Sequence, residues 1–111
     1  MTETTPFEDL THLDCAVHEP TRLAILTALS ACERADFVFL LRITGLTNGN
    51  LSAHLSKLEA ARLIEIEKRF VGKKAQILAS LIRPGRDAID AYWRTMETVR
   101  HRVASWVPEP A

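Results

Sequence analysis

The sequence has few of the features that characterise secreted, membrane or catalytic proteins. Only Cys15 and Cys32 occur among its 111 residues, so the chain has no disulfide framework. No apolar run reaches the roughly 18 residues of a membrane-spanning helix, and the first residues, Met-Thr-Glu-Thr-Thr-Pro, do not form a signal peptide. Glycine-rich phosphate loops, paired catalytic carboxylates and nucleophile elbows are missing. These absences predict a cytoplasmic protein that is not an enzyme.

An excess of charge is also missing. Lys plus Arg and Asp plus Glu both number 14, which gives a formal net charge of zero. This balance argues against indiscriminate binding of nucleic acid through bulk charge, although it leaves room for a local basic patch. The length, with 47% hydrophobic and 25% charged residues, predicts a single globular domain over residues 1–111.

The most informative stretch is 46–76, and its first half has the pattern of a helix. Leu51, Leu55 and Leu58 recur at i, i+4 and i+7 and therefore share one face, with Thr47 in the N-cap position. The opposite face is small and polar, so it can approach another surface closely. A face that contacts only solvent is the alternative. The candidate binding residues of this helix are Asn48, Gly49, Asn50, Ser52, Ala53, Ser56 and Lys57.

The second half of this stretch predicts two strands, at about 63–70 and 75–82, joined by a basic turn. Ile64 and Ile66 alternate with glutamates, as in a half-buried strand, and Gly72 permits a positive φ at the turn. A hairpin tip whose charges contact only solvent is the alternative to a binding site. The candidate binding residues of the turn are Lys68, Arg69, Lys73, Lys74 and Gln76.

Together the two halves predict binding to double-stranded DNA. A helix with a bare polar face suits the major groove, where base edges are distinguishable, and a cationic hairpin tip suits phosphates. Asparagine pairs with adenine edges, and alanine contacts a thymine methyl group. We expect Asn50, Ser52 and Ser56 to lie nearest the bases and Lys57 to contact a phosphate.

The rest of the chain predicts further helices. One is expected over 7–17, a second from Pro20 to about residue 32, and a last one from Pro84 to about residue 106. The apolar run 37–43 fits a buried strand or a helix. We interpret it as a helix because Asp36 can cap its start and the glycine at 45 can end it.

Four segments carry a resemblance to winged-helix transcriptional regulators of the MarR and ArsR types: 18–26, 51–59, 70–74 and 84–86. The resemblance implies a mostly α fold with a small β-hairpin wing. A winged helix-turn-helix core would occupy 18–83, with helices 36–44 and 47–61 as the helix-turn-helix. Helices 7–17 and 84–106 would flank this core. Two positions differ from similar regulators, which often have a basic residue at Ser56 and a glycine near Arg62.

The last helix has an apolar seam with spacings of 3, 4, 3, 4 and 3 residues, typical of a helix packed lengthwise on another helix. Its partner is either the chain's own N-terminal helix or a second copy. The seam is too long for one short helix to cover, so we predict a homodimer, as in similar regulators. An alternative is that Phe7, Tyr92, Trp93 and Trp106 line an apolar ligand site at the dimer interface, although plain core packing is the simpler interpretation. The predicted dimer contacts are Phe7, Leu10, Ile89, Tyr92, Trp93, Met96, Val99, Val103 and Trp106.

Several remaining residues have simpler interpretations. His54 is expected to be a packed or capping histidine, and Arg22 to pair with a carboxylate or approach the DNA backbone. The cysteines are expected to be inert core thiols. His12, Cys15 and His18 are spread around a helix by their spacing, so no metal site or cofactor is predicted. No residue pattern specifies a small-molecule effector.

The sequence therefore predicts a homodimeric, sequence-specific regulator of transcription that binds double-stranded DNA. Repression is favoured because the chain has no obvious separate activating segment. The alternative is a winged-helix protein–protein interaction module without specific DNA binding. In that case Gly49, Ala53, Ser56 and Ala60 would receive a partner helix, and net neutrality fits this function equally well.

Overall fold

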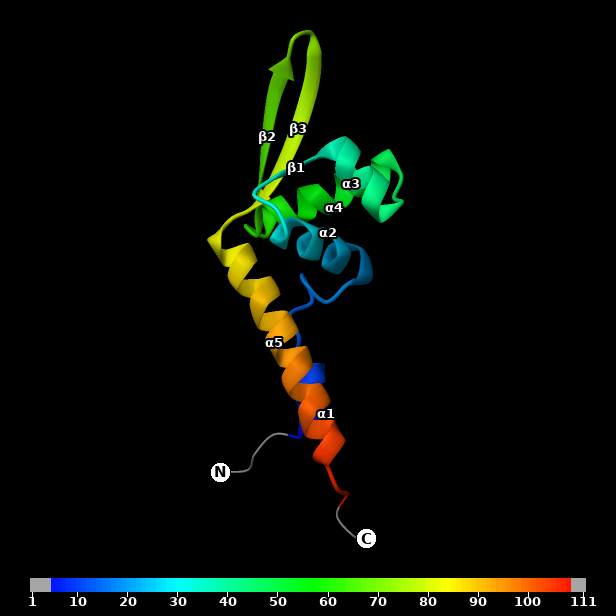
Figure 1. Cartoon of the computed structure of the whole chain (residues 1–111), viewed down its shortest axis with the longest axis vertical. Helices are drawn as coiled ribbons and strands as arrows, with labels where there is room; N and C mark the ends of the chain where they lie inside the picture. The colour runs from blue at the N-terminus through cyan, green and yellow to red at the C-terminus, as the bar shows by residue number, and fades with distance from the viewer. Residues whose placement is uncertain (1–4, 109–111) are drawn as a thin grey trace.

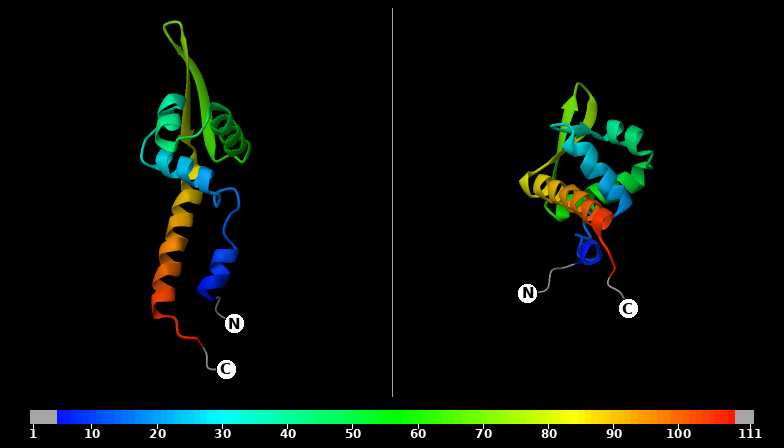
Figure 2. Two further views of the ribbon diagram at one scale, coloured as in Figure 1. Left: turned by 90° about the vertical axis from the view of Figure 1, so that its right-hand side faces the viewer. Right: turned by 60° about the horizontal axis from the view of Figure 1, so that its bottom comes forward.

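The chain is elongated, measuring 68 × 26 × 20 Å in the computed structural model, which describes residues 5–108 (Figure 1). A β-hairpin projects from one end, and a long helix runs to the other end, where both termini lie (Figures 1 and 2). Within the described range, no helix is both long and apolar enough to cross a membrane. In chain order the elements are α1 (Pro6–Thr11), α2 (Pro20–Ser30), β1 (Ala35–Asp36), α3 (Phe37–Thr44), α4 (Asn48–Ala60), β2 (Ile64–Val71), β3 (Lys74–Leu81) and α5 (Arg83–Ser105).

Capping residues set the limits of the two helices in the helix-turn-helix. The Asp36 carboxylate accepts a hydrogen bond from the Phe39 amide at 2.7 Å and starts α3, and Gly45 ends it with a left-handed φ of 69°. The Thr47 hydroxyl then accepts from the Asn50 amide at 3.1 Å and starts α4. The helical interpretation of 37–43 and the winged helix-turn-helix fold class are confirmed.

The predicted helix over 7–17 is wrong beyond Thr11, where α1 ends. The Asp14 carboxylate accepts from the amide two residues on, at 2.9 Å, which favours a turn. Arg22 of α2 holds the carbonyls at 15–16 with its guanidinium, at 3.0 and 2.9 Å respectively. These bonds hold the segment after α1 against the start of α2, and within residues 5–108 the Arg22 guanidinium forms no ion pair with a carboxylate.

The sheet is antiparallel with strand order β1-β3-β2. β2 and β3 pair from Ile64↔Leu81 to Val71↔Lys74, which leaves a two-residue turn. Its first residue, Gly72, has a φ of 65°, as a type II′ hairpin turn requires. The two strands agree with prediction to within one residue at each end, whereas the two-residue strand β1 was not predicted.

The core lies where α2, α4, the base of the sheet and the start of α5 meet. Leu51, Leu55 and Leu58 are all buried, so the predicted leucine stripe is the inner face of α4. Ile25 of α2 and Ile89 of α5 are completely buried in the same cluster. This packing holds α4 with its polar face outward.

The start of α5 approaches the base of β2 so closely that residue 85 must be glycine. A Cβ atom on Gly85 would lie 1.8 Å from the Leu63 carbonyl oxygen. The same carbonyl accepts a hydrogen bond from the Ile82 amide at 3.2 Å. This contact gives a structural reason for the Pro-Gly-Arg segment at 84–86.

The first half of the α5 seam packs inside its own chain. Ile89 is buried in the core, and the buried Tyr92 places its hydroxyl 3.0 Å from Nδ1 of His18. Trp93, which is half exposed, donates its indole N–H to the Thr27 hydroxyl of α2 at 3.3 Å. Ile89 therefore cannot contact a second copy as predicted, because the chain's own core leaves it no accessible surface.

The second half of α5 is flanked by α1, which lies alongside it (Figure 2). Asp9 of α1 forms an ion pair with Arg102 of α5 at 2.6 Å, and Val99 is buried beneath this contact region. Phe7 meets Trp106 edge to face, with ring centroids 5.0 Å apart. The apolar seam of α5 therefore has a partner within its own chain, the helix α1. Packing within the chain as a whole buries Tyr92 and Val99, half-buries Met96, and leaves the remaining predicted dimer contacts exposed: Phe7, Leu10, Trp93, Val103 and Trp106.

Candidate nucleic-acid interface

The outward face of α4 presents small polar groups to solvent. All seven residues predicted to bind DNA from this helix are exposed. In the described part of the chain, no hydrogen bond uses the side chains of Asn48, Asn50, Ser52 or Ser56, so their amides and hydroxyls are available to base edges. Gly49 has open space where a Cβ would be. The face is therefore flat enough to approach the floor of a groove.

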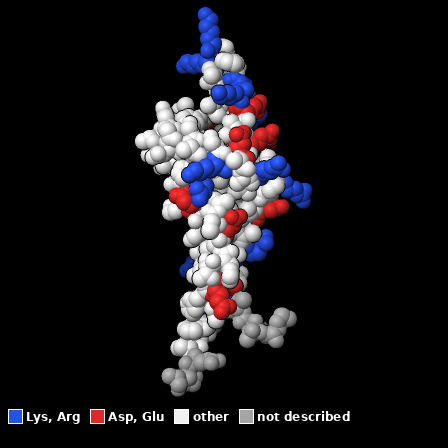
Figure 3. All heavy atoms as spheres, turned by 180° about the vertical axis from the view of Figure 1, so that it is seen from behind, with Lys and Arg blue, Asp and Glu red and all other residues white. Residues whose placement is uncertain are grey.

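The wing formed by β2, β3 and their turn carries the cations. Lys68, Arg69, Lys73 and Lys74 are exposed, as predicted. Viewed from behind, basic side chains occupy the tip of the molecule and acidic side chains gather below it (Figure 3). Glu67, nearer the base, pairs with Arg34 at 3.6 Å. Basic and acidic side chains are mixed on the body of the molecule, whereas the wing from Lys68 to Lys74 carries basic residues without acidic ones. The neutral net charge of the chain therefore does not describe this end.

One wing residue has a different role from the one predicted. Gln76 accepts a hydrogen bond from Nε of Arg69 at 2.9 Å and donates its amide N–H to the Asp36 carboxylate at 3.3 Å. The other oxygen of Asp36 caps α3. Gln76 therefore connects the wing to the start of α3 and orients Arg69 along the wing. Sequence spacing could not reveal this connection, because residues 36 and 76 are brought together only by the sheet.

The second residue after the end of α4 has unusual backbone geometry. Arg62 has a φ of 60°, the left-handed region that favours glycine. Similar regulators tend to have glycine near this position. This chain has arginine instead, at a residue whose backbone conformation favours glycine. The Arg62 side chain is exposed.

His54 lies on the inner flank of α4 and is packed, as predicted. Its Nδ1 is buried without a hydrogen bond, 3.8 Å from a carboxylate oxygen of Glu19. That separation allows charge attraction but exceeds hydrogen-bonding distance. Burial opposes ionisation of Glu19, but the amides of Arg22 and Thr21 bind its charged form, and His54 and Arg22 attract it. The pKa of Glu19 is therefore lowered. Glu19 thus caps α2 as an anion next to His54 of α4.

The cysteine and histidine residues of 12–18 do not gather. Within the described range, no three or more His, Cys, Asp or Glu side chains are close enough to hold a metal ion. Cys15 is exposed, contrary to the prediction of a core thiol, because it lies in the turn after α1. Cys32 is half-buried, and its thiol lies 3.4 Å from the Ala28 carbonyl oxygen.

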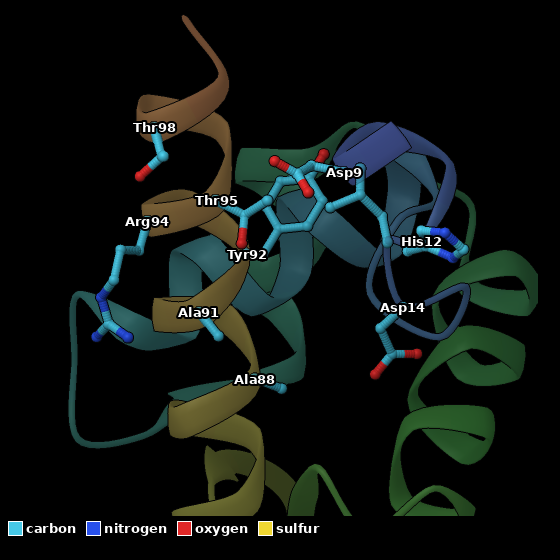
Figure 4. A pocket seen from close by; sticks show the side chains of 10 residues that line it. Asp9, His12, Asp14, Ala88, Ala91, Tyr92, Arg94, Thr95 and Thr98 are labelled. Atoms are coloured by element: carbon cyan, nitrogen blue, oxygen red, sulfur yellow. The ribbon is translucent and has the colours of Figure 1, made fainter. Parts of the chain in front are cut away.

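An open hollow of about 520 Å³ lies between the α1–α2 segment and α5. Figure 4 shows Asp9, His12 and Asp14 on one wall and Tyr92 and Thr95 on the other. Of the four aromatic residues considered for an apolar ligand site, only Tyr92 lines it. The hollow is therefore lined by more polar side chains than the aromatic ligand site considered in the sequence analysis.

A helix-turn-helix with an exposed polar second helix, followed by a basic hairpin, defines the class of winged-helix proteins that bind nucleic acid. Residues 21–99 match the family model described as a winged helix DNA-binding domain. The chain belongs to this family. Its resemblance to winged-helix transcriptional regulators is thereby confirmed.

Known proteins share both sequence and fold with the chain. An uncharacterised protein of Methanocaldococcus jannaschii is 32% identical over 71 residues, which cover 64% of this chain and 77% of the relative. A transcriptional regulator homologue of Pyrococcus horikoshii has a TM-score of 0.77 at 20% identity, covering 86% of this chain and 94% of its own. Bordetella bronchiseptica BpsR, whose DNA binding is regulated by 6-hydroxynicotinic acid, has a TM-score of 0.64 at 14% identity, covering 86% of this chain and 66% of its own. At these identities, the two structures demonstrate a shared fold.

Proposed function

We propose that the chain is a homodimeric transcriptional regulator that binds specific sites in double-stranded DNA, acts in the cytoplasm and has no enzymatic activity. The observation that carries this proposal is the pairing of an open polar helix face on α4 with a basic wing. The leucine stripe of α4 holds that face outward. The wing projects beyond the helices, at the opposite end of the molecule from the chain termini (Figure 1).

α4 is proposed to enter the major groove. Asn50 would pair with an adenine edge, and Ser52 and Ser56 would contact bases or nearby phosphates. Lys57, in the last turn of α4, would contact a phosphate. Ser56 supplies a hydroxyl where similar regulators often have a cation, so this chain would depend more on the wing for phosphate binding.

The wing is proposed to contact the flanking backbone or minor groove. If Lys68, Arg69, Lys73 and Lys74 each neutralise a phosphate, log K should fall against log salt with a slope of about −4 per half-site, at roughly −0.9 per contact. Because the rest of the chain balances this charge, binding to arbitrary DNA should be weak at physiological salt.

The homodimer is proposed to form through the apolar residues that α1 leaves uncovered. Phe7, Leu10, Val103 and Trp106 are exposed, and Val107 beyond α5 is 79% exposed. They lie on α1 and the end of α5, far from the wing. A twofold pair would place the two recognition helices in half-sites about 34–36 Å apart. We propose repression as the regulatory outcome, since a dimer bound at such a site would block access to it.

Selection of bound sequences from a random double-stranded DNA pool tests the function. An enriched inverted repeat with a steep salt dependence is expected. Lys73→Glu with Lys74→Glu should abolish specific binding. Arg94→Glu with Arg100→Glu is the matched control, because it makes the same charge change on exposed residues of α5. No enriched motif, or equal loss in both double variants, would contradict the proposal and favour the protein–protein module.

Light scattering tests the dimer. Val103→Glu with Val107→Glu should give a monomer, because both side chains are exposed and their loss leaves the chain's own core intact. Val38→Glu, a 63% exposed position on α3, should remain dimeric. A wild-type protein that is already monomeric at micromolar concentration would disprove the dimer.

A further inference from the structure

The wing tip carries two large apolar side chains that are mostly exposed. Phe70 is 75% exposed and Val71 is 60% exposed, immediately before Gly72 at the turn. The hairpin projects beyond the helices (Figure 1), and Val71 borders an open hollow shared with Phe37 and Val38 of α3. Further down the same strand, Ile64 is buried in the core.

The register of the hairpin places these two side chains on opposite faces of the tip. Phe70 is opposite Ala75, whose methyl group is too small to cover an aromatic ring, and Val71 is opposite Lys74. Consecutive strand residues alternate between faces. Both faces of the tip therefore present apolar surface, and the apex between them is a glycine followed by Lys73.

The charges carried by the hairpin tip itself are positive, and the Asp36 carboxylate of β1, which lines a hollow together with Val71, is hydrogen-bonded to Gln76. Lys68 and Arg69 precede the apolar pair and Lys73 and Lys74 follow it, while the nearest acidic residue along the strand is Glu67. A surface with an apolar centre and a cationic rim complements a ligand with an apolar interior and anionic edges. A nucleic-acid groove has this arrangement, with sugars and stacked bases between two lines of phosphates.

We propose that Phe70 and Val71 form an apolar wedge that enters the minor groove beside the site read by α4 and opens a base step there. This inference rests on the proposed DNA-binding function. The minor groove is about 6 Å wide, and the side-chain-free apex at Gly72 keeps the leading end of the hairpin narrow. Apolar wedges of this kind unstack a step and kink the duplex toward the major groove.

The wedge predicts a form of sequence preference that the polar residues of α4 do not supply. Pyrimidine–purine steps are the easiest to unstack, so sites with TA or CA at the flank should bind best. The cations beside Phe70 would hold the phosphates of the kinked step. Discrimination at this position would come from deformability of the DNA rather than from hydrogen bonds to bases.

Replacing both residues with threonine tests the wedge, because threonine also favours strands and preserves the hairpin. Phe70→Thr with Val71→Thr should lose about tenfold in affinity for the selected site, in keeping with the usual worth of aromatic–base stacking. The salt slope should not change, since no cation is removed. 2-Aminopurine at the flanking step should brighten on binding wild type but not this variant.

Three further variants make the outcome decisive. Phe70→Leu should retain the fluorescence signal, because leucine also serves as a wedge. Val38→Thr, at an exposed apolar position on α3, should behave as wild type. Lys73→Ala should reduce the salt slope by about one unit without changing the flanking preference.

The wedge is overturned if the threonine variant, with an unchanged melting temperature, retains wild-type affinity, fluorescence and flanking preference. It is also overturned if the variant instead loses binding to a protein partner while DNA binding persists. Failure of wild type to select any DNA site would instead refute the proposed function itself. The two failures are therefore distinguishable.

Discussion

Gly85→Ala should destabilise the protein although alanine is the better helix former. The new Cβ would lie 1.8 Å from the Leu63 carbonyl oxygen and 2.7 Å from its carbonyl carbon. These are backbone atoms, so α5 and the base of β2 must separate by about 1.6 Å to restore an ordinary 3.4 Å contact. That movement also stretches the hydrogen bond from the Ile82 amide to the same oxygen.

The net cost follows from three contributions. Overpacking of this kind costs about 1–3 kcal/mol, and losing the hydrogen bond costs about 1 kcal/mol. The higher helix propensity of alanine offsets this loss by about 1 kcal/mol of stabilisation. We therefore expect a loss of about 2 kcal/mol, which lowers the melting temperature of a domain of this size by about 8 °C.

Urea and thermal unfolding followed by circular dichroism measure this effect. Gly49→Ala is the matched control, because a Cβ at Gly49 in α4 meets nothing within 4 Å. It should be neutral or stabilise by up to about 1 kcal/mol. A Gly85→Ala protein that melts at or above the wild-type temperature would refute the inferred contact between α5 and β2.

Four other substitutions have defined outcomes. Arg62→Gly should raise stability by about 1 kcal/mol in urea unfolding, because glycine relieves the cost of a φ of 60°; a loss would show that the arginine side chain stabilises the fold. Glu19 has a lowered pKa, so its contribution to stability is present above its ordinary value of 4.5 and is lost as pH falls through the lower, folded-state pKa. Glu19→Gln should therefore flatten the unfolding free energy in that acidic range, and an unchanged pH profile would contradict this assignment. Gln76→Ala should weaken DNA binding without changing the salt slope, whereas Arg69→Ala should reduce the slope by about one unit; equal slopes in salt titrations of the two variants would refute the positioning role of Gln76.

Local signals were sufficient to predict the helix-turn-helix and the wing. Asp36 and Gly45 indicated a helix in a run whose composition also fits a strand, and both cap α3 as expected. The leucine stripe identified the inner face of α4 and, by exclusion, its outer face. Gly72 identified the turn of the wing. In each case the residues that determine the local structure lie within a few positions of it in the sequence.

Features that depend on distant partners could not be predicted. β1 has only two residues and exists because it pairs with Leu78 and Ala79. The turn at 12–18 depends on Arg22, which follows it in the next helix. Heptad spacing along α5 showed that the helix packs on something, but it could not separate the part covered by α1 from the part left exposed. The role of Gln76 could not be predicted either, since its side-chain amide could form hydrogen bonds within the chain or with a ligand.

The arrangement of the chain ends has a practical consequence for experiments. α1 returns alongside the far half of α5, so both ends of the described chain lie at the same extremity of a molecule 68 Å long, and the wing lies at the other (Figures 1 and 2). A biotin or fluorophore attached at residue 5 or residue 108 would therefore lie far from the wing. A biosensor surface that captures the protein at either of these residues would leave the wing facing the flowing solution.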